Sequence, residues 1–163
     1  MSATPTIGRV MFAFVFLASA MEKWNDLRAG ADAEVLRAVS PAMRIAKATV
    51  AENVGFNLCA MLPNDELLVK CATLIEALGA ALFACGFAFG AKLLILFTCA
   101  VTPVMHPFWR HLDDASLGND AVLGVEMIMF FKNVALVGAL VYYLGMRNEL
   151  SEARERVKKL KTN

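Results

Sequence analysis

Residues 67–105 read LLVKCATLIEALGAALFACGFAFGAKLLILFTCAVTPVM, and this stretch indicates the class of fold more clearly than any other. It contains two apolar segments, 67–89 and 91–105, with almost no loop between them. The first is long enough for a tilted crossing of a bilayer, which takes about 20 apolar residues. Pro103 and Pro107 lack the N–H group that a helix needs, so they mark the exit of the second segment. The stretch therefore predicts a tight helical hairpin that spans a membrane.

Two further apolar segments stand on either side of this hairpin in the sequence. The segment at 7–24 is apolar or small between charged residues and is barely long enough to span. A cleaved signal peptide would look similar and is the alternative to a retained helix. The segment at 121–146 is longer, and Tyr142 and Tyr143 close it at the depth of a membrane interface. Together the four segments predict four spans.

Composition agrees with an integral membrane protein. Of the 163 residues, 58% are hydrophobic and 19% are charged, and the mean hydropathy is +0.56, which is more apolar than a soluble domain of this size. We therefore predict an all-α, four-helix membrane bundle in residues 1–150 and a basic cytosolic tail in 151–163. The tail is short, lacks aromatic residues and is diluted by glutamates, so nucleic-acid binding is excluded.

The first loop, 25–66, is long and carries charges of both signs. Its apolar residues recur at roughly helical spacing, which favours a helix that lies on the membrane or caps the bundle. A loop without regular structure is the alternative. The apolar residues concerned are Val35, Leu36, Val39, Met43, Ile45, Ala46 and Val50.

The positions of the cations predict the orientation. Lysines and arginines are densest in the tail, and Lys92 lies in the tight hairpin, whereas the loop before the fourth span holds Asp113, Asp114 and Asp120. Cytosolic loops carry the excess of Lys and Arg. With four spans, both termini are then expected in the cytosol.

Charged residues deep in the apolar segments are the candidates for a functional site. A charge at the bilayer centre costs about 2.5 to 3.5 kcal/mol on insertion scales, so such residues usually find partners inside the bundle. Glu76 and Lys132 both fall near mid-membrane when about 1.5 Å per residue is counted along each helix. An ion pair between them is therefore compatible with the sequence, and Asn133 is adjacent to Lys132.

A polar pocket open to the luminal side is a second expectation. Glu126 and Asn133 are seven residues apart and share one stripe of a helix. His106, with Glu22 and Lys23, falls near the same luminal boundary. The polar cluster of Glu76, Lys132, Asn133, Glu126 and His106 either fixes helix packing or forms a site for a small molecule, a quinone or protons.

Small residues in the hairpin favour close helix contacts. Gly86 and Gly90 form a small-xxx-small pattern, and Gly79 extends the smooth surface upstream. We assign them to helix packing within the chain. Dimerisation through the same face is the alternative.

No catalytic, metal-binding or cofactor-binding motif stands out. The four cysteines lack both the paired spacing of a zinc site and a C-x-x-C redox motif. His106 and His111 are five apart around a proline, which is not the spacing of a metal pair on a helix. We therefore predict that the chain is not an enzyme and needs no metal or cofactor.

Three stretches carry a family resemblance: GRVMFAFVFLASAMEKWND at 8–26, GAALFACGFAFGAKLLILFTCAVTP at 79–103 and KNVALVGALVYYLGMRNEL at 132–150. Together they resemble the plant HR-like lesion-inducing proteins, a family of the wider DoxX-like group. The resemblance covers all four spans in order. It departs at the exit of the third span, where the family favours a Tyr-Asp-Phe-Tyr-like corner and this chain has His106-Pro107-Phe108-Trp109.

The resemblance implies a four-helix membrane bundle and little chemistry. Plant members are named for a cell-death phenotype, and bacterial DoxX-like relatives include small subunits associated with quinol or thiosulfate oxidation. Similarity of the DoxX-like group to the surfeit-type cargo receptors implies a cargo or membrane-organising role.

The last residues of the sequence suggest a localisation signal. Lys159 and Lys161 lie at the fifth and third positions from the last residue, which resembles a dilysine retrieval signal read by the vesicle coat. A plain positive-inside tail is the alternative.

Three functions follow from these expectations. The first is a non-catalytic protein of the endoplasmic reticulum that acts through membrane-protein partners in stress or cell death. The second is an accessory subunit of a redox complex in a mitochondrial or plastid membrane. The third is a small transporter or lipid-binding protein.

Overall fold

The computed structural model describes residues 4–28, 30–54, 64–111 and 119–162, and the part of the chain that it describes is helical, with no strand. This confirms the predicted all-α class. Four of the helices are long and apolar enough to cross a membrane, as the sequence predicted. The elements in order are α1 (Thr4–Leu27), the 3-10 turn η1 (Gly30–Asp32), α2 (Glu34–Val54), α3 (Asp65–Ala84), α4 (Ala88–Met105), the 3-10 turn η3 (Phe108–His111) and α5 (Asn119–Thr162).

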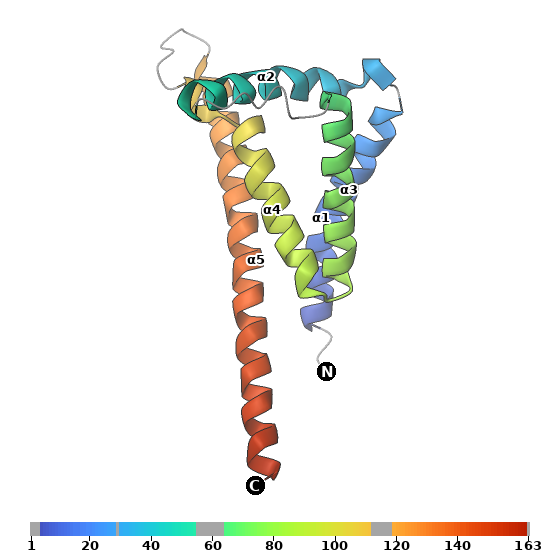
Figure 1. Ribbon diagram of the computed structural model, residues 1–163, viewed down its shortest axis with the longest axis vertical. Helices are drawn as coiled ribbons and strands as arrows, with labels where there is room; N and C mark the ends of the chain where they lie inside the picture. The colour runs from blue at the N-terminus through green and yellow to red at the C-terminus, as the bar shows by residue number, and fades with distance from the viewer. Residues whose placement is uncertain (1–3, 29, 55–63, 112–118, 163) are drawn as a thin grey trace.

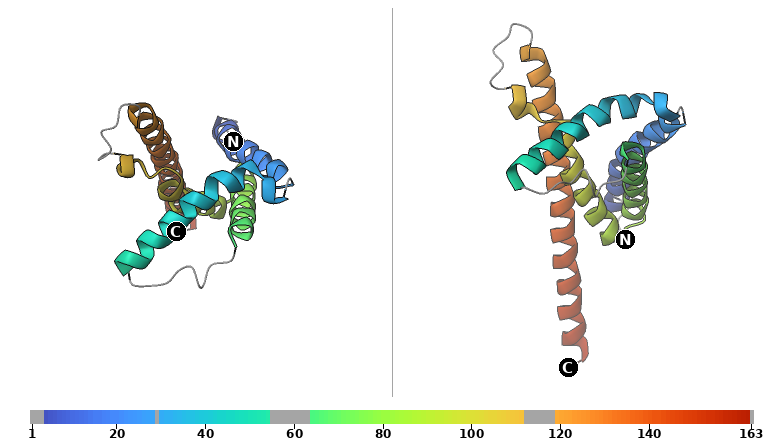
Figure 2. Two further views of the ribbon diagram at one scale, coloured as in Figure 1. Left: turned by 90° about the horizontal axis from the view of Figure 1, so that it is seen from above. Right: turned by 45° about the horizontal axis from the view of Figure 1, so that its top comes forward.

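The long helices form a row in which α1 packs on α3, α3 on α4 and α4 on α5. Helix α2 lies across one end of this row, and the first turn of α1 and the last turn of α5 both lie toward the opposite end (Figures 1 and 2). The predicted helix in the first loop is therefore present, and it covers the bundle end. The first turn of α1 and the last turn of α5 therefore lie on one side of the bundle (Figure 1).

The turn between α3 and α4 depends on one glycine. Gly86 adopts a φ of 90°, a conformation that residues with a Cβ atom rarely adopt. The N–H of Phe87 donates to the carbonyl of Leu82 at 2.9 Å and that of Cys85 to the carbonyl of Ala81 at 3.1 Å, which closes the helix end. Helix α3 thus ends at Ala84 and not at the predicted 89.

Close packing of α3 on α4 depends on the other two glycines of the hairpin. A Cβ atom on Gly90 would lie 2.3 Å from the backbone N of Phe83 and 2.7 Å from the carbonyl O of Gly79. A Cβ atom on Gly79 would lie 3.1 Å from Leu94 Cδ2. The missing side chains therefore let the two backbones approach, as expected for small-xxx-small packing.

The core lies where α1, α3, α4 and α5 come together. Phe83 of α3 packs edge-on against Phe12 of α1, with ring centroids 5.5 Å apart, and against Tyr143 of α5 at 4.9 Å. Aromatic pairs in this geometry add stability beyond the area they bury. The fully or nearly buried members of the core are Ala13, Phe16, Ala80, Phe83, Ala91, Leu94 and Leu140.

Helix α5 is much longer than the predicted span at 121–146 and includes most of the predicted tail. Its extension past the bundle is rich in Glu, Lys and Arg, which are good helix formers, and Glu152 pairs with Arg156 one turn on at 3.7 Å. Only 6% of the most apolar part of α5 is buried. Most of this helix is therefore uncovered by the rest of the chain.

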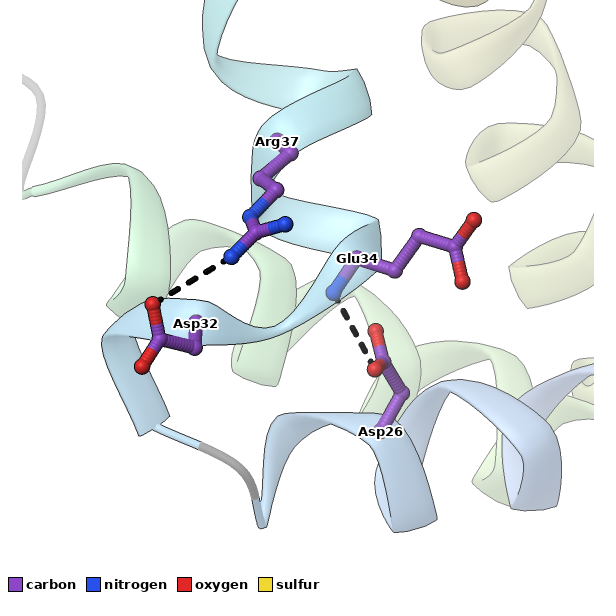
Figure 3. Close-up of polar contacts among 4 residues, drawn as sticks. All are labelled: Asp26, Asp32, Glu34 and Arg37. Atoms are coloured by element: carbon purple, nitrogen blue, oxygen red, sulfur yellow. Dashed lines mark hydrogen bonds and ion pairs between the residues drawn. The ribbon is translucent and has the colours of Figure 1, made fainter.

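The corner between α1 and α2 is held by hydrogen bonds to one carboxylate. Asp26 accepts the backbone N–H of Glu34 at 3.1 Å and that of Val35 at 2.6 Å, which satisfies N–H groups that have no partner within α2. Asp32 pairs with Arg37 at 3.3 Å beside it (Figure 3). Asp26 therefore fixes where α2 begins over the end of the bundle.

Candidate functional site

A cavity of about 260 Å³ lies beneath α2, between α3 and α4. Three side chains from successive turns of α2, Val35, Val39 and Met43, cover it. Most of its lining residues are half-buried rather than buried, so the cavity is open to the outside. The remaining lining residues are Lys23, Leu68, Val69, Ala72, Thr73, Glu76, Phe97, Ala100, Val101, Val104 and Met105.

One ion pair lies in the wall of this apolar cavity. Lys23 Nζ on α1 donates to Glu76 Oε2 on α3 at 2.8 Å. The same Nζ lies 5.5 Å from the ring centroid of Phe97 on α4, which is within cation–π range. Glu76 is 2% exposed and the Lys23 side chain 32%. The pair therefore joins α1 to α3, Lys23 also contacts α4 through Phe97, and the pair adds no net charge to the cavity.

Thr73 supplies a second polar group to the cavity wall. It lies one turn before Glu76, so the two side chains share the buried face of α3. Thr73 is 2% exposed, and its hydroxyl is among the buried side-chain groups that have no hydrogen-bond partner within the described chain. Buried polar groups nearly always have partners, so this hydroxyl is available to a bound molecule.

The structure does not bring Glu76 and Lys132 together. Helix α5 packs along α4, which separates it from the middle of α3, and Lys132 is exposed on α5. Lys23, which the sequence placed only at the luminal boundary, takes the position beside Glu76. Asn133 is half-buried and lies outside the cavity lining.

His106 and Glu126 form a separate contact near the α2 end of the bundle. His106 Nδ1, just past the end of α4, lies 3.1 Å from Glu126 Oε2 on α5, and both side chains are about a quarter exposed. Phe108 packs edge-on against Phe130 at 5.1 Å next to this contact. The predicted polar cluster is thus two sites, one beneath α2 and one between α4 and α5.

Comparison with known proteins identifies the family. The family model of HR-like lesion-inducing proteins matches residues 1–146. The chain belongs to the HR-like lesion-inducing family. The curated proteins and the solved structures compared with it gave no match. The match covers all four long apolar helices, and it leaves the extension of α5 beyond residue 146 outside the family region.

Two features of this HR-like lesion-inducing protein were not predicted from its sequence. The first is the cavity, which needs α2 as a cover; the spacing of apolar residues in the first loop predicts a helix but not where that helix lies. Lys23 looked like a flanking charge because it follows an apolar segment directly. The signal in the sequence that could have found it is that residues 22–27 contain neither Gly nor Pro, so a helix can continue past Lys23, as α1 does to Leu27.

The side chains that face the cavity define what it can hold. Within the part of the chain that the structure describes, no three residues of His, Cys, Asp and Glu are grouped to hold a metal ion. The groups facing the cavity are a lysine already paired with a glutamate, a threonine hydroxyl and apolar side chains. Such a set can hold an apolar molecule with a small polar head.

Proposed function

We propose that this chain is a non-catalytic integral membrane protein of the endoplasmic reticulum that acts through membrane-protein partners. Its family name links it to hypersensitive-response-like lesions, and the proposed role is accordingly in cell death or stress. The four long apolar helices support insertion. Their outward side chains are largely apolar, as lipid contact requires.

The observation that carries the partner-dependent role is the uncovered face of α5. Lys132 is exposed at the middle of the apolar part of this helix and forms no ion pair with another described residue. A lysine facing lipid at that depth costs about 2.5 to 3.5 kcal/mol. Gly124 and Gly138 have open space around them, and small residues favour close approach of a second helix. A transmembrane partner with an acidic or polar side chain would relieve the cost of Lys132.

Residence in the endoplasmic reticulum is proposed from the end of α5. Lys159 and Lys161 are exposed in its last turn, on the same side of the bundle as the start of α1 (Figure 1). If that side is cytosolic, both lysines are accessible to the vesicle coat.

The test is imaging of the chain with an internal or N-terminal tag, beside a variant with Lys159→Ser and Lys161→Ser. Reticular staining that shifts to post-Golgi membranes in the variant is the expected result. Mitochondrial or plastid staining that the variant leaves unchanged would contradict the proposal and favour the accessory-subunit alternative. The matched control replaces Lys158, which lies outside the dilysine spacing.

A second candidate function is favoured by the cavity beneath α2. An open apolar cavity with one polar wall is the usual form of a small-molecule site. This observation supports a lipid-binding or transporter role over a purely structural one, and it is compatible with partner binding through α5 because the two surfaces are separate.

A further inference from the structure

The cavity beneath α2 has a chemical character that defines a class of ligand. We propose that it binds a single-chain lipid with an uncharged, hydroxyl-bearing head, whose hydroxyl bonds to Thr73 and to the Lys23–Glu76 pair. This inference rests on the second candidate function and names its ligand class. It does not depend on the partner-binding face of α5.

The size and lining of the cavity indicate a single chain. A volume of about 260 Å³ lies just below the roughly 300–1,000 Å³ of pockets that enclose drug-sized ligands. The lining from α2 and α4 is apolar, and it includes Val39 and Met43 of α2 and Val101 and Val104 of α4. One hydrocarbon chain fits such a surface. Because these side chains are only half-buried, the rest of a longer chain can extend out of the cavity.

The polar wall indicates an uncharged head. Lys23 and Glu76 neutralise each other at 2.8 Å. A carboxylate or ammonium head would add an uncompensated charge next to the buried Glu76 carboxylate and its lysine partner, which is costly. A hydroxyl adds none.

Hydrogen bonding indicates a hydroxyl in particular. The wall contains donors in the Lys23 ammonium, an acceptor in the Glu76 carboxylate and a group of both kinds in Thr73. A ligand hydroxyl can donate and accept at once, so it can bond to the wall on both sides. It would also satisfy the Thr73 hydroxyl, which lacks a partner within the described chain.

The experiment uses the full chain purified in lipid nanodiscs and a long-chain primary alcohol that carries a diazirine in its chain. Light attaches the probe, and mass spectrometry locates it. We expect attachment to residues of α2 or α4 that line the cavity. Unlabelled competitors of equal chain length are the alcohol, the fatty acid and the alkylamine, and we expect the alcohol to compete at least 10-fold better than the two charged lipids.

Two threonine variants provide the matched pair. Thr73→Val keeps the shape and removes the cavity hydroxyl, so the alcohol should compete about 3- to 10-fold more weakly, the effect of one net hydrogen bond. Thr98→Val removes the other threonine hydroxyl that is buried without a partner in the described chain. Thr98 does not line the cavity, so Thr98→Val should leave competition by the alcohol unchanged. Thr73→Ser retains the cavity hydroxyl, so the alcohol should compete with it as well as it does with the unchanged chain.

A third variant tests the role of the ion pair in head selection. Glu76→Gln leaves the Lys23 charge unbalanced, so competition by the fatty acid should become stronger relative to competition by the alcohol. Attachment only to the outer faces of the helices would overturn the proposal. So would stronger competition by the fatty acid than by the alcohol in the unchanged chain, or equal effects of Thr73→Val and Thr98→Val. None of these outcomes bears on imaging of the tail variant, so the two proposals fail separately.

Discussion

Lys23 Nζ of α1 lies 2.8 Å from Glu76 Oε2 of α3, and this pair joins two helices at the wall of an otherwise apolar cavity. Glu76 is almost fully buried, whereas Lys23 retains some contact with the outside. The buried Glu76 carboxylate therefore needs the lysine for charge compensation, whereas the Lys23 ammonium is also partly solvated.

Loss of the lysine partner should destabilise the bundle. Breaking a fully buried pair costs about 3 to 5 kcal/mol. Because the Lys23 side chain is 32% exposed, we expect Lys23→Ala to lower the free energy of unfolding by only about 2 kcal/mol. Thermal unfolding of the purified chain in detergent measures this. The control is Glu22→Ala, an exposed neighbour, and equal effects of the two variants would contradict the assigned pairing.

Lys132 should contribute little to the stability of the isolated chain. It is exposed and unpaired among the described residues, so Lys132→Leu should leave the unfolding temperature unchanged or raise it. Glu76→Leu in the same assay should lower the unfolding temperature because Lys23 loses its partner. A decrease in unfolding temperature for Lys132→Leu as large as that for Glu76→Leu would instead support the Glu76–Lys132 pair that the sequence suggested.

Gly90 should tolerate no side chain. A Cβ atom there would lie 2.3 Å from backbone N of Phe83, and backbone cannot yield cheaply, so Gly90→Ala should destabilise by about 1 to 3 kcal/mol or more. Gly138→Ala is the matched control because nothing lies within 4 Å of its added Cβ atom. That variant should be neutral or stabilising, by up to about 1 kcal/mol. Similar unfolding temperatures for the two variants would show that α3 and α4 are not packed this closely.

Asp26 should determine how firmly α2 covers the cavity. Removing a helix cap costs about 0.5 to 2 kcal/mol, so Asp26→Ala should speed hydrogen exchange at the backbone amides of Glu34 and Val35, which Asp26 holds. Asp32→Ala removes only an exposed ion pair with Arg37, which is worth at most about 1 kcal/mol. Faster exchange of the same two amides in Asp32→Ala alone would contradict this assignment.

The sequence predicted the four long helices well because length and hydropathy are enough to recognise a long apolar helix. The hairpin in residues 67–105 was predicted with its turn at residue 90, whereas α3 ends at Ala84 and the turn lies at Gly86. The difference reflects a glycine conformation that hydropathy does not encode. The extension of α5 was missed because charged residues that prefer water can still form a helix.

The candidate site was less predictable. Glu76 stood out because a carboxylate in an apolar segment needs a partner, but the choice between Lys23 and Lys132 depends on which helices are neighbours. Spacing along one helix carries no such information. His106 and Glu126 were both singled out by the sequence, yet their contact depends on how the chain turns after α4.

The most direct test of the partner-dependent role is photocrosslinking from α5 in living cells. A photoreactive amino acid at Ile128, which is exposed one turn from Lys132, should give one discrete adduct with a membrane protein, and Lys132→Leu should abolish it. The same amino acid at Phe14, exposed on α1, serves as the control for chance encounters. Adducts at Ile128 that match those at Phe14, or that persist in Lys132→Leu, would contradict the claim that this face of α5 binds a partner.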